Sequence, residues 1–229
     1  THAITSGLAS AGPFLTAQNM NEQRLNIDGN MEDNPHTFLV PDTEWAFIHI
    51  TKTGGTSVRR YLKMPNEKKA EGKKHMTGQD IQATVSPQRF SEFRFFTVVR
   101  EPFDRMQSYW KYRMRKRAAA GKERIPFDQW LLKLVELPIQ NNSRRTQAHY
   151  LQANGTFLPN VHILRFEHLE SELTGFAQAH HLKTLKAFPH ANPSAVPEGF
   201  DGGYTPAMRD LVREMFEEDF ERFGYPLYP

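Results

Sequence analysis

Short apolar runs alternate with longer amphipathic stretches from residue 45 onwards. Three runs have the length and the β-branched and aromatic content of buried strands: WAFIHI (Trp45–Ile50), FRFFTVV (Phe93–Val99) and VHILRF (Val161–Phe166). Residues that break a strand or begin a helix follow each run. Nearly continuous apolar runs of this kind are typical of strands that are covered on both faces, as in a parallel sheet.

Between and after these strands the apolar positions recur at helical spacing. The pattern predicts helices at Thr56–Lys63 and from Pro102, which suits the first turn of a helix. The helix after Pro102 has its apolar face at Phe103, Met106, Trp110 and Met114.

A further helix is predicted at the end of the chain, with Thr205 as its N-cap, Pro206 in its first turn and Gly224 as its stop. Its buried stripe is Met208, Leu211, Val212, Met215 and Phe216. Strands that alternate with helices predict an α/β domain, which we expect to be a P-loop-type three-layer fold with a central parallel sheet flanked by helices. Residues 1–40 lack periodicity and are expected to form an N-terminal extension, whereas 41–229 form a single domain.

Composition narrows the function classes only slightly. The net charge of +3 is too small to indicate nucleic acid, and no apolar stretch approaches the ~18 residues of a membrane span. The chain has no cysteine, which removes disulfides and cysteine nucleophiles and favours the cytoplasm. The sequence starts at Thr1 rather than Met, so the Golgi lumen is the alternative if an N-terminal anchor was trimmed.

Basic residues gather in one strip, Lys111–Arg124, which holds seven basic residues and the single acid Glu123. The strip is either a solvated helix face or a surface that attracts a polyanion or an acidic substrate.

The sequence HITKTGGTSV places a lysine, two glycines and several hydroxyl residues directly after the first predicted strand. In a strand–loop–helix unit, glycines let the backbone N–H groups approach an anion. The common nucleotide loop has its lysine after the glycines, but here Lys52 precedes Gly54 and Gly55, and the second strand ends in Arg100 rather than in an aspartate for magnesium. The loop therefore predicts a phosphate-like ligand held without a metal.

The loop resembles the 5′-phosphosulfate loop of the sulfotransferases, and FFTVVREPFDRMQSYW resembles their 3′-phosphate segment. The match is closer to the carbohydrate branch, with its uronyl 2-O- and chondroitin sulfotransferases and bacterial relatives, and KHMTGQDI and LRFEHL extend it. The resemblance implies 3′-phosphoadenosine 5′-phosphosulfate (PAPS) as co-substrate, 3′,5′-diphosphoadenosine (PAP) as product, and no metal. The implied 5′-phosphosulfate ligands are Lys52, Thr53, Gly54, Gly55, Thr56 and Ser57, and the implied 3′-phosphate ligands are Arg100 and Ser108.

His75 lies between the two motifs, where the resembling enzymes place a base histidine, and imidazole has a suitable intrinsic pKa of ~6.5. The resemblance therefore makes His75 the expected general base, with Lys52 stabilising charge on the bridging oxygen. We interpret His49 as a packing residue, and take Lys74 and Gln147 as candidate contacts of a hydroxyl acceptor. A carbohydrate, such as an acidic glycan, fits as acceptor.

Two other functions remain open at this stage. A P-loop small-molecule kinase would require magnesium and ATP, against which the loop order and the missing carboxylate count. A non-catalytic polyanion-binding module using the basic strip would bind in a strongly salt-dependent way and would leave Lys52–Ser57 unexplained.

Overall fold

The computed structural model describes residues 37–65, 75–189 and 203–227. The residues from Thr37 onwards belong to one compact unit. Phe38 and Val40, which we placed in the N-terminal extension, are buried in this unit at 5% and 1% exposure. Residues 1–36 of the predicted extension lie outside the described residues, as do Lys74 and most of the segment between His190 and Thr205.

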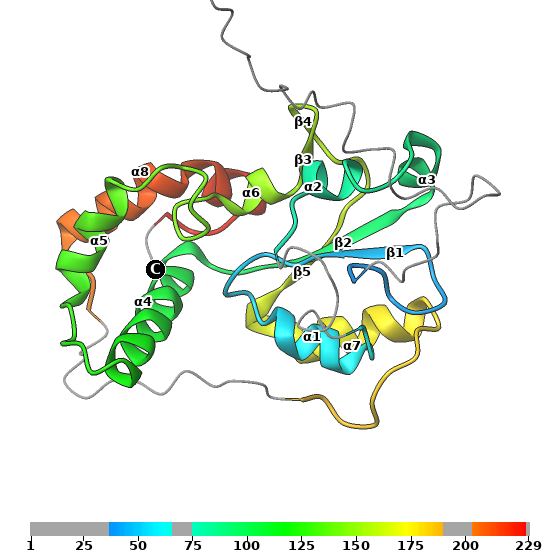
Figure 1. Ribbon diagram of the computed structural model, residues 1–229, viewed down its shortest axis with the longest axis horizontal. Helices are drawn as coiled ribbons and strands as arrows, with labels where there is room; N and C mark the ends of the chain where they lie inside the picture. The colour runs from blue at the N-terminus through cyan, green and yellow to red at the C-terminus, as the bar shows by residue number, and fades with distance from the viewer. Residues whose placement is uncertain (1–36, 66–74, 190–202, 228–229) are drawn as a thin grey trace, which may run out of the picture. The chain divides into compact units, whose positions relative to one another are not determined.

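A parallel sheet forms the centre of the domain (Figure 1). Its strands are β1 (Trp45–Ile48), β2 (Arg94–Val99) and β5 (His162–Arg165), in the order β1-β2-β5. Each pair is parallel, with Phe47 opposite Phe96 and Val98 opposite Leu164. The three strands predicted from the apolar runs are therefore confirmed, together with the predicted central parallel sheet flanked by helices.

Helices and a small hairpin surround this sheet in the described part of the chain. The helices are α1 (Gly55–Tyr61), α2 (Gly78–Gln82), α3 (Pro87–Glu92), α4 (Pro102–Ala119), α5 (Phe127–Val135), α6 (Gln147–Tyr150), α7 (Leu169–Ala179) and α8 (Pro206–Phe223). A 3₁₀ turn at Phe166–His168 precedes α7, and the strands β3 (Gln152–Ala153) and β4 (Thr156–Phe157) form the hairpin. None of the described helices is both long and apolar enough to cross a membrane.

The two faces of the sheet bury two separate apolar clusters. Because successive side chains of a strand point to opposite faces, Phe47 packs with α1 and α7, whereas its neighbours Ala46 and Ile48 pack in the cluster that includes α4, α5 and α8. Figure 1 shows α1 and α7 together beneath one face of the sheet. This coverage explains why the strands are almost continuously apolar.

The helix ends follow the capping residues predicted from the sequence. Thr205 caps α8 by accepting a hydrogen bond from the N–H of Met208, and Gly224 ends the helix in the left-handed conformation. Pro102 occupies the first turn of α4. The four predicted core residues of α4 are all at most 3% exposed, so both amphipathic helices are confirmed.

Candidate active site

The loop between β1 and α1 has an unusual backbone. Lys52 has a φ of 68° and Gly54 a φ of 79°, and alternation of left- and right-handed residues turns successive N–H groups to one side of a loop. At Gly54 the left-handed backbone favours glycine, and a Cβ there would also lie 2.7 Å from the side chain of Leu169. The Thr53 hydroxyl donates to the carbonyl of Ile50 at 3.0 Å and is buried, so only the backbone of Thr53 is available to an anion.

Arg100 follows β2 and meets this loop directly. Because the carboxyl ends of parallel strands lie at one edge of the sheet, the guanidinium reaches the Lys52 carbonyl and donates to it at 3.1 Å. It also pairs with Asp104 at 2.6 Å and lies 3.9 Å from the ring centroid of Phe166, the residue that follows β5. The ends of all three parallel strands thus contribute to one place.

A large cavity of about 1530 Å³ opens at this edge of the sheet. The predicted site residues that line it are Lys52, Gly54, Gly55, Thr56, Ser57, His75, Arg100 and Ser108. Ser108 lies on α4, two helical turns after Arg100, and is 6% exposed. In residues 37–65, 75–189 and 203–227, no three His, Asp or Glu side chains gather in a way that could hold a metal ion.

His75 lies against the start of the loop. Its Nδ1 is 3.0 Å from the carbonyl oxygen of His49, and the two imidazole rings lie 4.3 Å apart between centroids. A carbonyl can only accept, so Nδ1 carries the hydrogen in this contact and Nε2 holds the lone pair. The imidazole is therefore oriented with its basic nitrogen on the side away from the His49 carbonyl.

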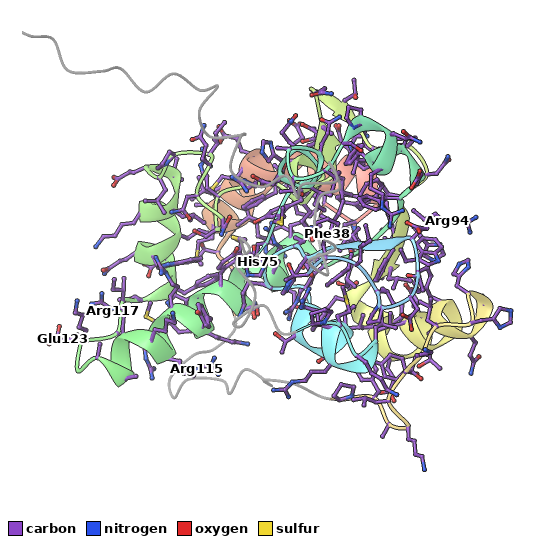
Figure 2. All side chains as sticks on the ribbon, turned by 45° about the vertical axis from the view of Figure 1, so that its right-hand side comes forward. Phe38, His75, Arg94, Arg115, Arg117 and Glu123 are labelled. Carbon is purple, nitrogen blue, oxygen red and sulfur yellow. The ribbon has the colours of Figure 1, made fainter. Side chains whose placement is uncertain are left out.

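Part of the basic strip lines the cavity. Lys111, Arg113 and Arg115 contribute to its wall. Tyr112, from the same stretch of α4, lies 4.5 Å below the Lys52 ammonium, which fixes the position of that long side chain. The strip continues away from the site, since Arg117 in the last turn of α4 and Glu123 in the segment after it lie far from His75 (Figure 2).

Gln147 has a different position from the one expected. Its side chain has no exposed surface and does not line the cavity. Its amide oxygen accepts from the N–H of Arg100, and its amide nitrogen donates to the carbonyl of Arg100, both at 2.8 Å. An acceptor cannot reach this amide, which instead fixes the backbone from which the Arg100 side chain projects.

A buried ion pair supports both of the segments that were predicted to bind anions. Arg105 is fully buried and donates to the carbonyls of Thr51 and Arg145, each at 3.2 Å. Asp219 of α8 lies 3.7 Å from it and accepts from the N–H groups of Gln147 and Ala148, each at 2.9 Å. Burial raises the pKa of the Asp219 carboxyl, an effect that Arg105 opposes. The network joins the loop base at Thr51 to the residue that holds Arg100.

A second buried contact holds the other side of the loop. The Tyr109 hydroxyl of α4 contacts the Thr51 hydroxyl and donates to the carbonyl of Asn142 at 2.6 Å. Burial raises the pKa of Tyr109, so this phenol stays a neutral hydrogen-bonding group.

Sequence reasoning missed several residues of the site. Phe166 is the last residue of the third predicted strand, and the rule that ligands bind at strand carboxyl ends was the signal that could have found it. No local signal marked Tyr112, Arg105 or Asp219, because the partners described above lie 40 to 114 residues away.

Comparison with known proteins gives one family and one structure. A family model described as "Sulfotransferase family" matches residues 35–226. A crystal structure of a sulfotransferase from Alicyclobacillus acidocaldarius is similar to this chain with a TM-score of 0.43 and 16% identity, covering 78% of this chain and 93% of that one. No curated protein matches the chain.

Proposed function

The chain belongs to the sulfotransferase family, and from this premise we propose that it moves a sulfuryl group from PAPS to a hydroxyl group of a carbohydrate. The observation that carries the proposal is the contact between the two anion-binding segments. Lys52 and Gly54–Ser57 follow β1, Arg100 and Ser108 follow β2, and all of them line one cavity. A nucleotide with anionic groups on both its 5′ and 3′ positions needs two such sites.

The chemistry of the lining residues fits the donor. The loop offers backbone N–H groups and the Lys52 ammonium, and the second segment offers a guanidinium and a hydroxyl. When bound, PAPS supplies a sulfuryl group that is already activated by its bond to the 5′-phosphate. A sulfuryl group carries less negative charge than a phosphoryl group, so hydrogen bonds and one lysine suffice to offset the charge that develops.

Lys52 is the proposed stabiliser of the leaving oxygen. Its ammonium would neutralise the negative charge that the 5′-phosphate gains as the bond to sulfur breaks. Tyr112 holds this ammonium from one side at 4.5 Å, which reduces the number of positions that the flexible side chain samples.

His75 is the proposed general base. Because Nδ1 faces the carbonyl of His49, Nε2 would take the proton of the acceptor hydroxyl while the hydroxyl oxygen forms its bond to sulfur. The proton released by the acceptor thus ends on His75, and the negative charge of the reaction ends on the nucleotide beside Lys52.

The two alternatives from the sequence are less well supported. Family membership counts against a small-molecule kinase. A module that only binds polyanions would need exposed basic side chains. The contact between Arg100 and the Lys52 carbonyl adds no such charge, so this function leaves the contact unexplained. The basic residues Lys111, Arg113 and Arg115 do favour an acidic glycan as acceptor, because they line the same cavity.

The proposal is tested by incubating the protein with PAPS labelled with radioactive sulfur and a panel of acceptors. The panel contains neutral oligosaccharides, acidic oligosaccharides, phenols and hydroxyl-bearing metabolites. We expect label in a carbohydrate and PAP as the second product. Label in a phenol but in no carbohydrate would overturn the assignment of the acceptor, and tight binding of magnesium ATP without sulfuryl transfer would favour the kinase.

A further inference from the structure

His49 connects the loop to His75 in a way that packing alone does not explain. It directly follows β1, is 6% exposed, and its ring stacks on Phe47 with centroids 5.5 Å apart. The same ring also lines the cavity. An imidazole at this place therefore has one side in the core and another beside the site.

The ring of His49 lies directly on Gly55. A Cβ at position 55 would come within 2.1 Å of both Cδ2 and Nε2 of His49, closer than any real Cβ contact. Gly55 is not among the glycines with a positive φ, so its backbone suits any residue. Glycine is required at position 55 because of the neighbouring His49 ring. At position 54 glycine is required both by the left-handed backbone, with a φ of 79°, and by the nearby side chain of Leu169.

His49 also contacts His75 twice. The backbone carbonyl of His49 lies 3.0 Å from Nδ1 of His75. The ring of His49 lies edge-on against the ring of His75, at 4.3 Å and 63°. The first contact selects the tautomer of His75, and the second limits rotation of its ring.

We propose that His49 is a positioning residue that holds His75 in register with the anion-binding loop, and that its ring is the reason why residue 55 is glycine. The proposal rests on the proposed function, since it assigns a partner to the base of that reaction. One residue then sets both the distance of the loop backbone from the strand end and the direction of Nε2 on the base.

The first test is a double-mutant cycle between positions 49 and 55, measured as PAP affinity by calorimetry. In Gly55→Ala the new methyl group must displace the His49 ring, and we expect PAP to bind about tenfold more weakly or worse, a coupling typical of residues in contact. In the His49→Ala background the same Gly55→Ala change should cost less than about threefold, since the space is now open.

Gly54→Ala is the matched control for this cycle. Its cost comes from the left-handed backbone and from Leu169, so His49→Ala should not relieve it. Equal losses from Gly55→Ala in both backgrounds would overturn the proposal, as would equal relief of Gly54→Ala. The same cycle with His49→Ser keeps the test decisive if His49→Ala does not fold.

The second test separates positioning from a merely structural role. His49→Ala should lower kcat at least about tenfold while the KM for PAPS changes much less, because the base loses its orientation and the loop keeps its donors. His49→Gln, a planar polar side chain of similar reach, should restore part of kcat. A kcat loss that tracks only a loss of folded protein, measured by thermal unfolding, would contradict the proposal.

A readout without turnover completes the test. The nitrogen chemical shifts of His75 report which ring nitrogen carries hydrogen. We expect the Nδ1–H form in the wild-type protein and a smaller fraction of it in His49→Ala, because the His75 ring can then rotate away from the residue 49 carbonyl, which the substitution leaves in place. Unchanged shifts together with unchanged kcat would refute the positioning role. A wild-type protein that binds no PAP and transfers no label would instead count against the proposed function.

Discussion

The guanidinium of Arg100 donates to the backbone carbonyl of Lys52 over 3.1 Å. Residues that follow two neighbouring strands, 48 positions apart in the chain, are therefore in direct contact. The contact uses Nη1 of the guanidinium. The other two nitrogens, Nε and Nη2, lie 2.7 and 2.6 Å from the carboxylate of Asp104. A side chain fixed on both sides is well prepared to bind an anion without further ordering.

Two anion sites predict a clear preference among nucleotides. PAP should bind tightly without magnesium, and 5′-AMP should bind more weakly because it lacks the group that Arg100 and Ser108 would hold. Arg100→Leu should weaken PAP about ten- to a hundredfold, the range expected for a lost charged hydrogen bond, and should leave 5′-AMP nearly unchanged. Calorimetry with both nucleotides measures this preference.

Arg94 provides the control for this prediction. It is the first residue of β2, whereas Arg100 follows the opposite end of that strand, and it lies far from the centre of the domain in Figure 2. Arg94→Leu should leave both affinities unchanged. Equal affinities of PAP and 5′-AMP for the wild-type protein would refute the second anion site.

Loss of the base should affect turnover and not donor binding. His75→Ala is expected to lower kcat by about two to four orders of magnitude, the usual contribution of a general base, with little change in PAP affinity. Lys52→Ala should lower both kcat and PAP affinity, because an ammonium beside the phosphosulfate stabilises the bound ground state and the transition state. Steady-state kinetics and calorimetry on the two variants separate these outcomes. His181→Ala, an exposed histidine after α7, is the control, and near-normal turnover of His75→Ala at saturation would remove His75 from this role.

Gln147 should matter for binding although it touches no ligand. Gln147→Leu leaves the N–H and the carbonyl of Arg100 without their buried partners, which should lower the free energy of unfolding by about 1–3 kcal/mol. It should also reduce the preference for PAP over 5′-AMP, since Arg100 loses its fixed backbone. Urea unfolding and the nucleotide affinities measure the two effects.

The exposed Gln88 of α3 serves as the matched position for that change. Gln88→Leu should alter neither stability nor the nucleotide preference. A Gln147→Leu protein of normal stability with an undiminished PAP preference would show that the amide does not position Arg100.

Stability should fall on mild acidification because two histidines have a pKa below the usual value. Burial lowers the pKa of His162 and of His149 below the usual value, and a nearby charge adds to the effect in each case. The unfolded chain therefore binds protons first as the pH falls through about 6.5, and the free energy of unfolding decreases from there downwards.

The raised pKa values of Glu101 and Asp219 act in the opposite direction at lower pH. The measurement is therefore a difference between wild type and His162→Gln, in urea at pH 7.5 and at pH 5.5. The variant should lose less stability over this interval than the wild-type protein. An equal or larger loss in His162→Gln would contradict the assignment.

The parts of the fold that depend on local pattern were predictable from the sequence. The strand before Lys52, the strand before Arg100 and the capped helix after Thr205 each carry their signal within a few residues. The meeting of Lys52 with Arg100 also followed, because parallel strands end at one edge of a sheet.

What the sequence did not predict is the pairing of buried polar groups across long distances. Gln147 was expected at the acceptor and is instead bonded to Arg100. His49 was interpreted as a packing residue, and its ring does stack on Phe47, yet it also lies against Gly55 and His75. Periodicity tells which side of an element is buried, but it does not tell which polar partner will be found there.

The Arg105–Asp219 pair has a consequence for the order in which the chain is made. Asp219 lies on α8, 114 residues after Arg105, yet it holds the segment that fixes Arg100 and faces the arginine that fixes Thr51. Synthesis proceeds from the N-terminus, and domains fold as units. A nascent chain on the ribosome therefore has the loop at Lys52 early but lacks the means to hold it, and we expect the protein to bind its proposed donor only after α8 has emerged and docked.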